Sequence, residues 1–168
     1  MTTENFDAAL AQFDAAIATA TTAMACYKVL QTLTEQIVGV KLFTVMTVDM
    51  TAELARRAYT SDAANYPASG TKPITYDDWF EIVHKKRNHF VANTLADIAK
   101  VFPDYELIGS LGCGSVVNLP VIAGDELLAT VNMLHEEQYF TPERVDLITK
   151  YLSIPAKAAH LAALRLGK

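Results

Sequence analysis

Apolar and polar residues alternate over residues 116–134 in a pattern that predicts two antiparallel strands. Gly124-Asp125 separates the two runs, and glycine accepts the positive φ that tight hairpin turns require. A three-residue loop over 124–126 pairs Asn118 with Asn132, whereas a two-residue loop shifts the register by one and pairs Asn118 with Val131. The pattern thus predicts the hairpin but leaves two registers open.

In the three-residue register, one face of the hairpin is uniformly apolar and the other is mixed. The apolar face comprises Val117, Leu119, Val121, Ala129, Val131 and Met133. The mixed face comprises Val116, Asn118, Pro120, Thr130, Asn132 and Leu134. We expect the apolar face to pack on helices and the mixed face to border a semi-polar cavity.

Residues 4–38 predict a helix, because their apolar residues are spaced by four and three. The resulting heptad seam consists of Phe6, Leu10, Phe13, Ile17, Ala20, Met24 and Tyr27. Threonines at 19, 21 and 22 are weak helix formers and indicate a candidate break. The seam is longer than one compact domain needs, which predicts a homodimer paired through its terminal helices.

The remaining pattern predicts short elements followed by one long helix. Strands are expected at 40–49, 53–61 and 90–92, a proline- and glycine-rich loop at 61–75, and short helices at 76–87, 94–101 and 104–109. Thr141 and Pro142 suit the cap and first position of the final helix. This order predicts an α+β fold with an antiparallel sheet of five to six strands.

Composition favours a single soluble domain. The chain has 168 residues, 51% of them apolar, and a formal net charge of -5, which argues against a nucleic-acid partner. No apolar run approaches a membrane span, and Glu4, Asp7 and Asp14 are unlike a signal peptide. Cys26 and Cys113 are far apart in sequence and suggest no disulfide framework, so the expected location is cytoplasmic.

Motifs for phosphate or metal binding lack the context they need. The glycines of residues 109–114 spell G-x-x-G-x-G, but they precede a strand instead of opening a helix, so a tight turn is the better interpretation. His84 and His89 are five residues apart, which is not the spacing of a helical zinc pair. We therefore expect no metal site.

Two asparagines and several aromatic residues are the candidate binding groups. Asparagine is unfavourable in strands, so Asn118 facing Asn132 suggests either a mutual structural bond or a polar anchor for a ligand. Tyr59, Tyr66 and Trp79 either wall a pocket or form core beneath a loop.

Longer phrases of the sequence carry a resemblance to a known family. They are Y-T-S-D-A-A-N-Y-P-A-S-G-T-K-P at 59–73, Trp79, F-V-A-N-T-L-A-D-I at 90–98, F-P-D-Y-E-L-I-G-S-L-G-C-G-S at 102–115, and the distal hairpin. These resemble small bacterial single-domain GAF proteins over most of the chain. The resemblance implies one GAF-like domain over 1–168, with a helical segment at 1–38, the sheet and pocket loops at 39–140, and a C-terminal helix at 141–168. It also implies terminal helices on one face of the sheet, short helices and loops on the other, and a non-catalytic sensory domain that dimerises.

An enzymatic branch of the same superfamily reduces free methionine sulfoxide with cysteines. When the proline of its hairpin is aligned with Pro120, its catalytic cysteine falls at Gly109 instead of Cys113. The reductase and a ligand-free dimerisation domain are the alternative functions.

The predicted pocket lies between the mixed face and the loops. Its candidate ligand-binding residues are Tyr59, Tyr66, Trp79, Cys113, Ser115, Asn118 and Asn132, with Cys113 and Ser115 near the rim. The ligand is a small organic molecule that the sequence does not identify, and no catalytic residue or cofactor is assigned.

Overall fold

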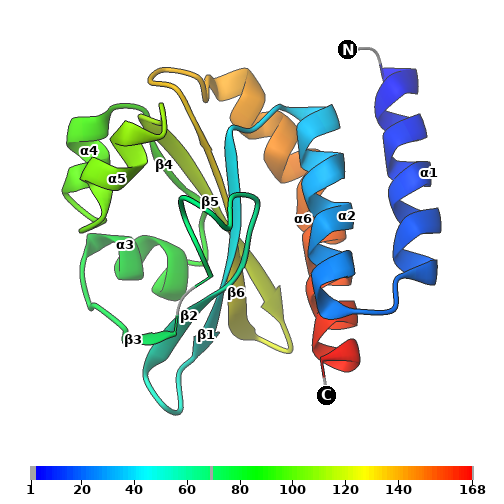
Figure 1. Ribbon diagram of the computed structural model, residues 1–168, viewed down its shortest axis with the longest axis horizontal. Helices are drawn as coiled ribbons and strands as arrows, with labels where there is room; N and C mark the ends of the chain where they lie inside the picture. The colour runs from blue at the N-terminus through cyan, green and yellow to red at the C-terminus, as the bar shows by residue number, and fades with distance from the viewer. Residues whose placement is uncertain (1–2, 69, 168) are drawn as a thin grey trace.

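A computed structural model describes residues 3–68 and 70–167 as an antiparallel sheet between two layers of helices (Figure 1). The six strands of this described part are β1 (Leu42–Asp49), β2 (Leu54–Thr60), β3 (Thr71–Pro73), β4 (Phe90–Ala92), β5 (Ser115–Ala123) and β6 (Glu126–His135). Their order is β3-β2-β1-β6-β5-β4, with every neighbouring pair antiparallel. The predicted α+β class is thus confirmed.

Long and short helices occupy opposite faces of this sheet. On one side, α2 (Ala23–Ile37) and α6 (Pro142–Leu166) lie nearest the sheet, and α1 (Thr3–Thr19) packs on their outer side, as Figure 1 shows. The other side contains α3 (Asp78–Phe80), the π-helical turn η1 (Glu81–Lys85), α4 (Leu95–Ala99) and α5 (Tyr105–Ser110). Among the described residues, no helix has the length and apolar character needed to cross a membrane.

The N-terminal segment forms two helices instead of one. The break lies at residues 20–22, where the Thr22 hydroxyl caps α2 by accepting the Ala25 backbone N–H at 3.0 Å. Phe6 and Phe13 are buried in the core of the same chain, whereas Met24 is 56% exposed. The prediction of one continuous seam is therefore wrong, because α1 folds back beside α2 and buries its own apolar side. The homodimer stays a prediction and needs a different surface.

The distal hairpin has the predicted register with a shorter loop. Gly124 and Asp125 both have positive φ, 59° and 62°, and form a two-residue turn. A β-bulge with Leu128 as the extra residue then restores the offset, so Asn118 pairs with Asn132. The alternative pairing of Asn118 with Val131 assumed regular strands and is wrong for that reason.

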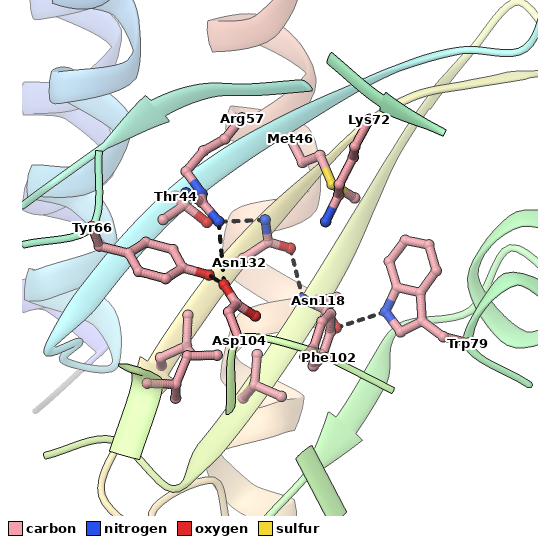
Figure 2. Close-up of a pocket in the computed structure, with 13 residues that line it drawn as sticks. Thr44, Met46, Arg57, Tyr66, Lys72, Trp79, Phe102, Asp104, Asn118 and Asn132 are labelled. Carbon is pink, nitrogen blue, oxygen red and sulfur yellow. Dashed lines mark hydrogen bonds and ion pairs between the residues drawn. The ribbon is translucent and has the colours of Figure 1, made fainter. Parts of the chain in front are cut away.

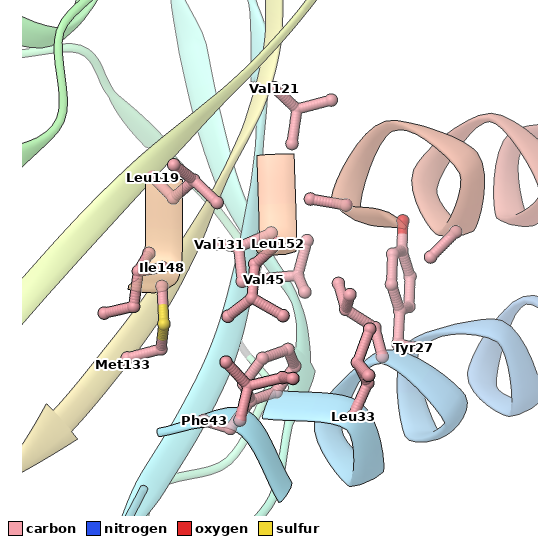
Figure 3. Packing of buried hydrophobic residues seen from close by; sticks show 14 of the residues in the cluster. Tyr27, Leu33, Phe43, Val45, Leu119, Val121, Val131, Met133, Ile148 and Leu152 are labelled. Atoms are coloured by element: carbon pink, nitrogen blue, oxygen red, sulfur yellow. The ribbon is translucent and has the colours of Figure 1, made fainter. Parts of the chain in front are cut away.

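The two faces of the hairpin have the environments that their side chains predict. The mixed face turns toward the short helices, and Figure 2 shows two of its residues, Asn118 and Asn132, beside polar residues of other elements. The apolar face packs with side chains of the long helices in one buried cluster, in which Figure 3 shows Leu119, Val131 and Met133 beside Ile148 and Leu152.

Two of the three expected short helices form, as α4 and α5, and irregular structure is confined to the segment before them. The loop at 61–75 contains β3, an edge strand that the sequence analysis did not predict, and the expected helix at 76–87 divides into α3 and η1. Asp77 caps α3 through the Phe80 backbone N–H at 3.0 Å, and Thr94 caps α4 through the Asp97 N–H at 3.1 Å. Thr141 caps α6 as predicted.

Candidate functional site

A cavity of about 50 Å³ lies between the mixed face of the sheet and the segment that carries α3 and α5 (Figure 2). Strand residues form its floor, and Trp79, Phe102, Asp104 and Ile108 close it from the opposite layer. The floor consists of Thr44, Met46, Arg57, Lys72, Val116, Asn118, Asn132 and Leu134, with Tyr66 at its side. Apolar and polar side chains thus meet in one small space.

Four polar side chains form a hydrogen-bonded chain along the cavity. Trp79 Nε1 donates to Asn118 Oδ1 at 2.9 Å, Asn118 Nδ2 donates to Asn132 Oδ1 at 2.7 Å, and Asn132 Nδ2 donates to Thr44 Oγ1 at 3.1 Å. An indole N–H can only donate, so Trp79 requires the oxygen of Asn118 to face it. This orientation of the Asn118 amide fixes that of Asn132, so all three hydrogen bonds run in one direction, from Trp79 to Thr44.

The geometry of the paired asparagines is compatible with both alternatives that their spacing left open. They bond to each other across the strands, as the structural alternative expected, and they also line a cavity, as the ligand alternative expected. Each amide nitrogen uses one of its two N–H groups in the bonds found among the described residues. The second N–H of each amide is the group that could hold a ligand.

A charged cluster forms another wall of the cavity. Arg57 Nη2 lies 3.5 Å from Asp104 Oδ2, its Nη1 donates to the Pro67 carbonyl at 2.8 Å, and its Cζ lies 3.7 Å from the centre of the Tyr66 ring. The Tyr66 hydroxyl donates to the same Asp104 oxygen. Burial, followed by this bond to Asp104, raises the pKa of Tyr66, which keeps the phenol protonated and donating.

A second bulge explains why Arg57 reaches the cavity. In β2, Tyr59 pairs with Val45 and Arg57 pairs with Met46, so Ala58 is the extra residue. Without the bulge, Arg57 and Tyr59 would share a face. Strict alternation gave no reason to select Arg57 or its partner Asp104, so the sequence analysis missed both.

A larger cavity of about 140 Å³ adjoins the first one. The two share Met46, Lys72, Trp79 and Phe102 as walls. Most of the remaining lining is apolar: Val48, Ala55, Pro73, Ile74, Phe80, Val101, Pro103 and Leu127. His84 also lines it, and among the described residues its buried Nδ1 has no hydrogen-bond partner.

Four of the seven predicted ligand-binding residues line the first cavity. These are Tyr66, Trp79, Asn118 and Asn132. The structure brings them together from β5, β6, α3 and the loop that follows β2.

Tyr59, by contrast, lies on the helix-facing side of the sheet. Its ring packs near Tyr27 and Phe43, and its hydroxyl donates to Gln31 Oε1 at 2.6 Å. The bulge at Ala58 sends its side chain away from the cavity. Its assignment to the pocket is therefore corrected.

Cys113 and Ser115 also lie outside the lining of both cavities. Cys113 is 4% exposed in an apolar cluster with Ile98 and Ile108, and burial raises the pKa of its thiol. The Ser115 hydroxyl donates to the Glu136 carbonyl at 2.6 Å. Their expected place at the pocket rim is corrected, because the Cys113 thiol packs in this cluster and the Ser115 hydroxyl bonds to a backbone carbonyl.

Metal ligands do not gather anywhere in residues 3–68 and 70–167. No group of three or more histidine, cysteine or acidic residues in this part could hold an ion. The polar groups of the cavity, amides and one arginine–aspartate pair among them, suit hydrogen bonding to an organic molecule.

Together, a six-stranded antiparallel sheet, long terminal helices on one face and a cavity under short elements on the other define a GAF-like fold. The chain overlays the GAF domain of an Acinetobacter phosphoenolpyruvate-protein phosphotransferase with a TM-score of 0.70 and 10% identity, covering 100% of this chain and 99% of that one. No family model matches the sequence, and no curated protein matches it significantly. The predicted recognition is thus confirmed at the level of fold.

Two other solved structures of this fold contain bound molecules. One is the phycoerythrobilin-bound GAF domain of a cyanobacterial phytochrome, with a TM-score of 0.68, 12% identity and coverage of 98% and 99%. The other is the free methionine-R-sulfoxide reductase of Neisseria meningitidis in complex with its substrate, with a TM-score of 0.66, 14% identity and coverage of 98% and 95%. At these identities the likeness concerns the fold.

Proposed function

We propose that this protein is a non-catalytic sensory GAF domain that binds a small organic molecule in the cavity beside Asn118 and Asn132. The observation that carries the proposal is the series of hydrogen bonds from Trp79 to Thr44 along the cavity. These bonds use only one N–H group of each asparagine amide, so the second is available to a ligand. Such sites combine apolar walls with a few placed polar groups. The bilin-bound phytochrome domain is similar in fold and supports a binding role.

The sensory role also needs an output, for which we propose a homodimer through the terminal helices. The outer side of α6 exposes Ile154, Leu161 and Leu164, and Ile154 is 77% exposed. Ile154 and Leu161 are seven residues apart, so they lie on one side of the helix. A second copy of this stripe is a self-complementary partner for it.

A sulfoxide reductase is the second candidate, because one solved structure of this fold has that activity. A cysteine nucleophile needs a lowered thiol pKa and access to substrate. Burial instead raises the pKa of Cys113, and the thiol lies outside both cavities. These features argue for the binding role over the reductase.

Native mass spectrometry of freshly purified protein tests the binding role. We expect a small-molecule adduct that is lost on denaturation and reduced in Asn118→Leu, while Thr130→Val retains it. Thr130 is a matched control because it lies on the same face of β6, two residues from Asn132. Protein that carries no adduct and binds nothing from a metabolite panel would support the ligand-free dimerisation domain. Turnover of free methionine sulfoxide with a thiol reductant would establish the reductase.

A further inference from the structure

The second cavity has the size of a single aromatic ring. Its volume of about 140 Å³ is close to that of an engineered protein cavity of about 150 Å³ that binds benzene. Phe80, Phe102 and Trp79 contribute aromatic walls, and Met46 contributes a polarisable thioether. A planar apolar ring would bury its surface there without displacing a polar group from its partner.

The shared wall between the cavities provides a cation. Lys72 lines both cavities and forms no ion pair among the residues the structure describes. The other charged groups are engaged: Arg57 lies against Asp104, and Asp77 accepts the Phe80 backbone N–H. An anionic group on a ligand would therefore find its partner at Lys72.

The first cavity limits the size of that anionic group. A water molecule needs about 10–15 Å³ in this measure, so about 50 Å³ holds about three to five water-sized atoms. A carboxylate has three heavy atoms and two oxygens that accept hydrogen bonds. The reserve N–H groups of Asn118 and Asn132 donate, which again matches an acceptor group.

His84 provides a polar atom in the ring cavity that the first cavity lacks. His84 lines the larger cavity but not the first one, and its buried Nδ1 has no hydrogen-bond partner among the described residues. Burial lowers the pKa of His84, and Arg87 and Lys85 lower it further, so the imidazole is neutral at pH 7. A hydroxyl can donate to or accept from a ring nitrogen, so it suits either neutral tautomer.

We propose that the ligand is a monocyclic aromatic carboxylate with a ring hydroxyl. The ring occupies the larger cavity, the carboxylate meets Lys72 and the asparagine amides, and the hydroxyl bonds to His84. This assignment rests on the proposed binding function and narrows it to one class of molecule.

Titration calorimetry with four probes tests the class. Para-hydroxyphenylacetate should bind best, phenylacetate should bind about 3- to 10-fold more weakly for one lost hydrogen bond, and benzyl alcohol and acetate should bind far more weakly than either. Acetate lacks the ring and benzyl alcohol lacks the charge, so each omits one half of the proposed recognition. Equal binding of phenylacetate and benzyl alcohol would overturn the anionic requirement.

Two variants assign the contacts. Lys72 is exposed on β3, so Lys72→Gln should weaken phenylacetate binding by about 2- to 5-fold, the effect of losing a solvent-screened ion pair, whereas Lys28→Gln on the exposed side of α2 should leave it unchanged. His84→Phe keeps a ring against Phe80 and should remove the preference for the para-hydroxyl probe. An unchanged preference, or equal effects of the two lysine variants, would contradict the proposal.

The failures of the two proposals are distinguishable. If native mass spectrometry finds an adduct that Asn118→Leu weakens while no aromatic acid binds, the ligand class is wrong and the binding function stands. If no adduct is found and neither aromatic acid binds, both proposals are wrong.

Discussion

Replacing Asn118 by leucine should destabilise the protein, because this amide connects two other polar groups. The substitution roughly preserves volume but leaves Trp79 Nε1 and Asn132 Oδ1 without their partners. A buried group that loses its partner costs about 1–3 kcal/mol. Asn132 is buried, whereas Trp79 is only partly buried and can turn its N–H toward water. We therefore expect a loss of about 2–4 kcal/mol in the free energy of unfolding.

Urea unfolding followed by far-UV circular dichroism measures this loss without relying on the perturbed tryptophan. The double variant Asn118→Leu with Asn132→Leu should cost less than the sum of the single variants, because the two amides bond to each other. Thr130→Val is the matched control, since Thr130 is 0% exposed and its hydroxyl has no partner among the described residues. It should be neutral or stabilising by up to about 1 kcal/mol. Additive losses, or a loss below about 0.5 kcal/mol for Asn118→Leu, would refute the argument that the chain of amides acts as a unit.

Three further predictions concern assembly, pH and the thiols. Ile154→Asp should shift the dimer toward monomer in sedimentation while the protein stays folded, because Ile154 is exposed. Phe13→Asp should instead unfold the protein, because Phe13 is buried. An unchanged sedimentation coefficient of Ile154→Asp would exclude the α6 interface. Burial lowers the pKa of His160, which bonds to Tyr27 Oη at 2.9 Å, so near and below pH 6.5 the unfolded state binds more protons than the folded state. The free energy of unfolding should therefore decrease as the pH is lowered from about 7.5 to about 5.5. Urea unfolding of His160→Gln should show a smaller decrease over the same range. Cys113 should react with a thiol reagent only as fast as the protein unfolds, and rapid reaction in the native state would reopen the reductase alternative.

The sequence predicted those elements whose signals are local. The alternation over 116–134 identified a buried hairpin, and the threonine and proline at 141–142 identified the start of α6. The same signals failed where tertiary contacts decide the structure. Residues 71–73 form an edge strand because they pair with β2, and the split of 76–87 into α3 and η1 has no local signature.

The candidate site was predictable only in its strand-borne half. Asn118 and Asn132 were found because a polar pair on facing strands is unusual. Asp104 and Lys72 could not be found in the same way, because one precedes a short helix and the other lies on the unpredicted β3. Their relevance comes from the first cavity, which is assembled from segments far apart in the chain.

Energetics explain why β2 contains a bulge between Arg57 and Tyr59. Beside Val45 the helix-facing side of the sheet is an apolar cluster, where an arginine would lose its hydration and find no comparable set of acceptors. On the other side the same arginine has the Pro67 carbonyl, the Asp104 carboxylate and the Tyr66 ring. Tyr59 in turn suits the helix side, since its ring packs there and its hydroxyl bonds to Gln31. In a regular strand, Arg57 and Tyr59 would share one face, and one of them would lie on the side that does not suit it. The extra residue at Ala58 disturbs the strand pairing only locally and turns the two side chains to opposite faces. The bulge thereby places the charge of Arg57 in the cavity.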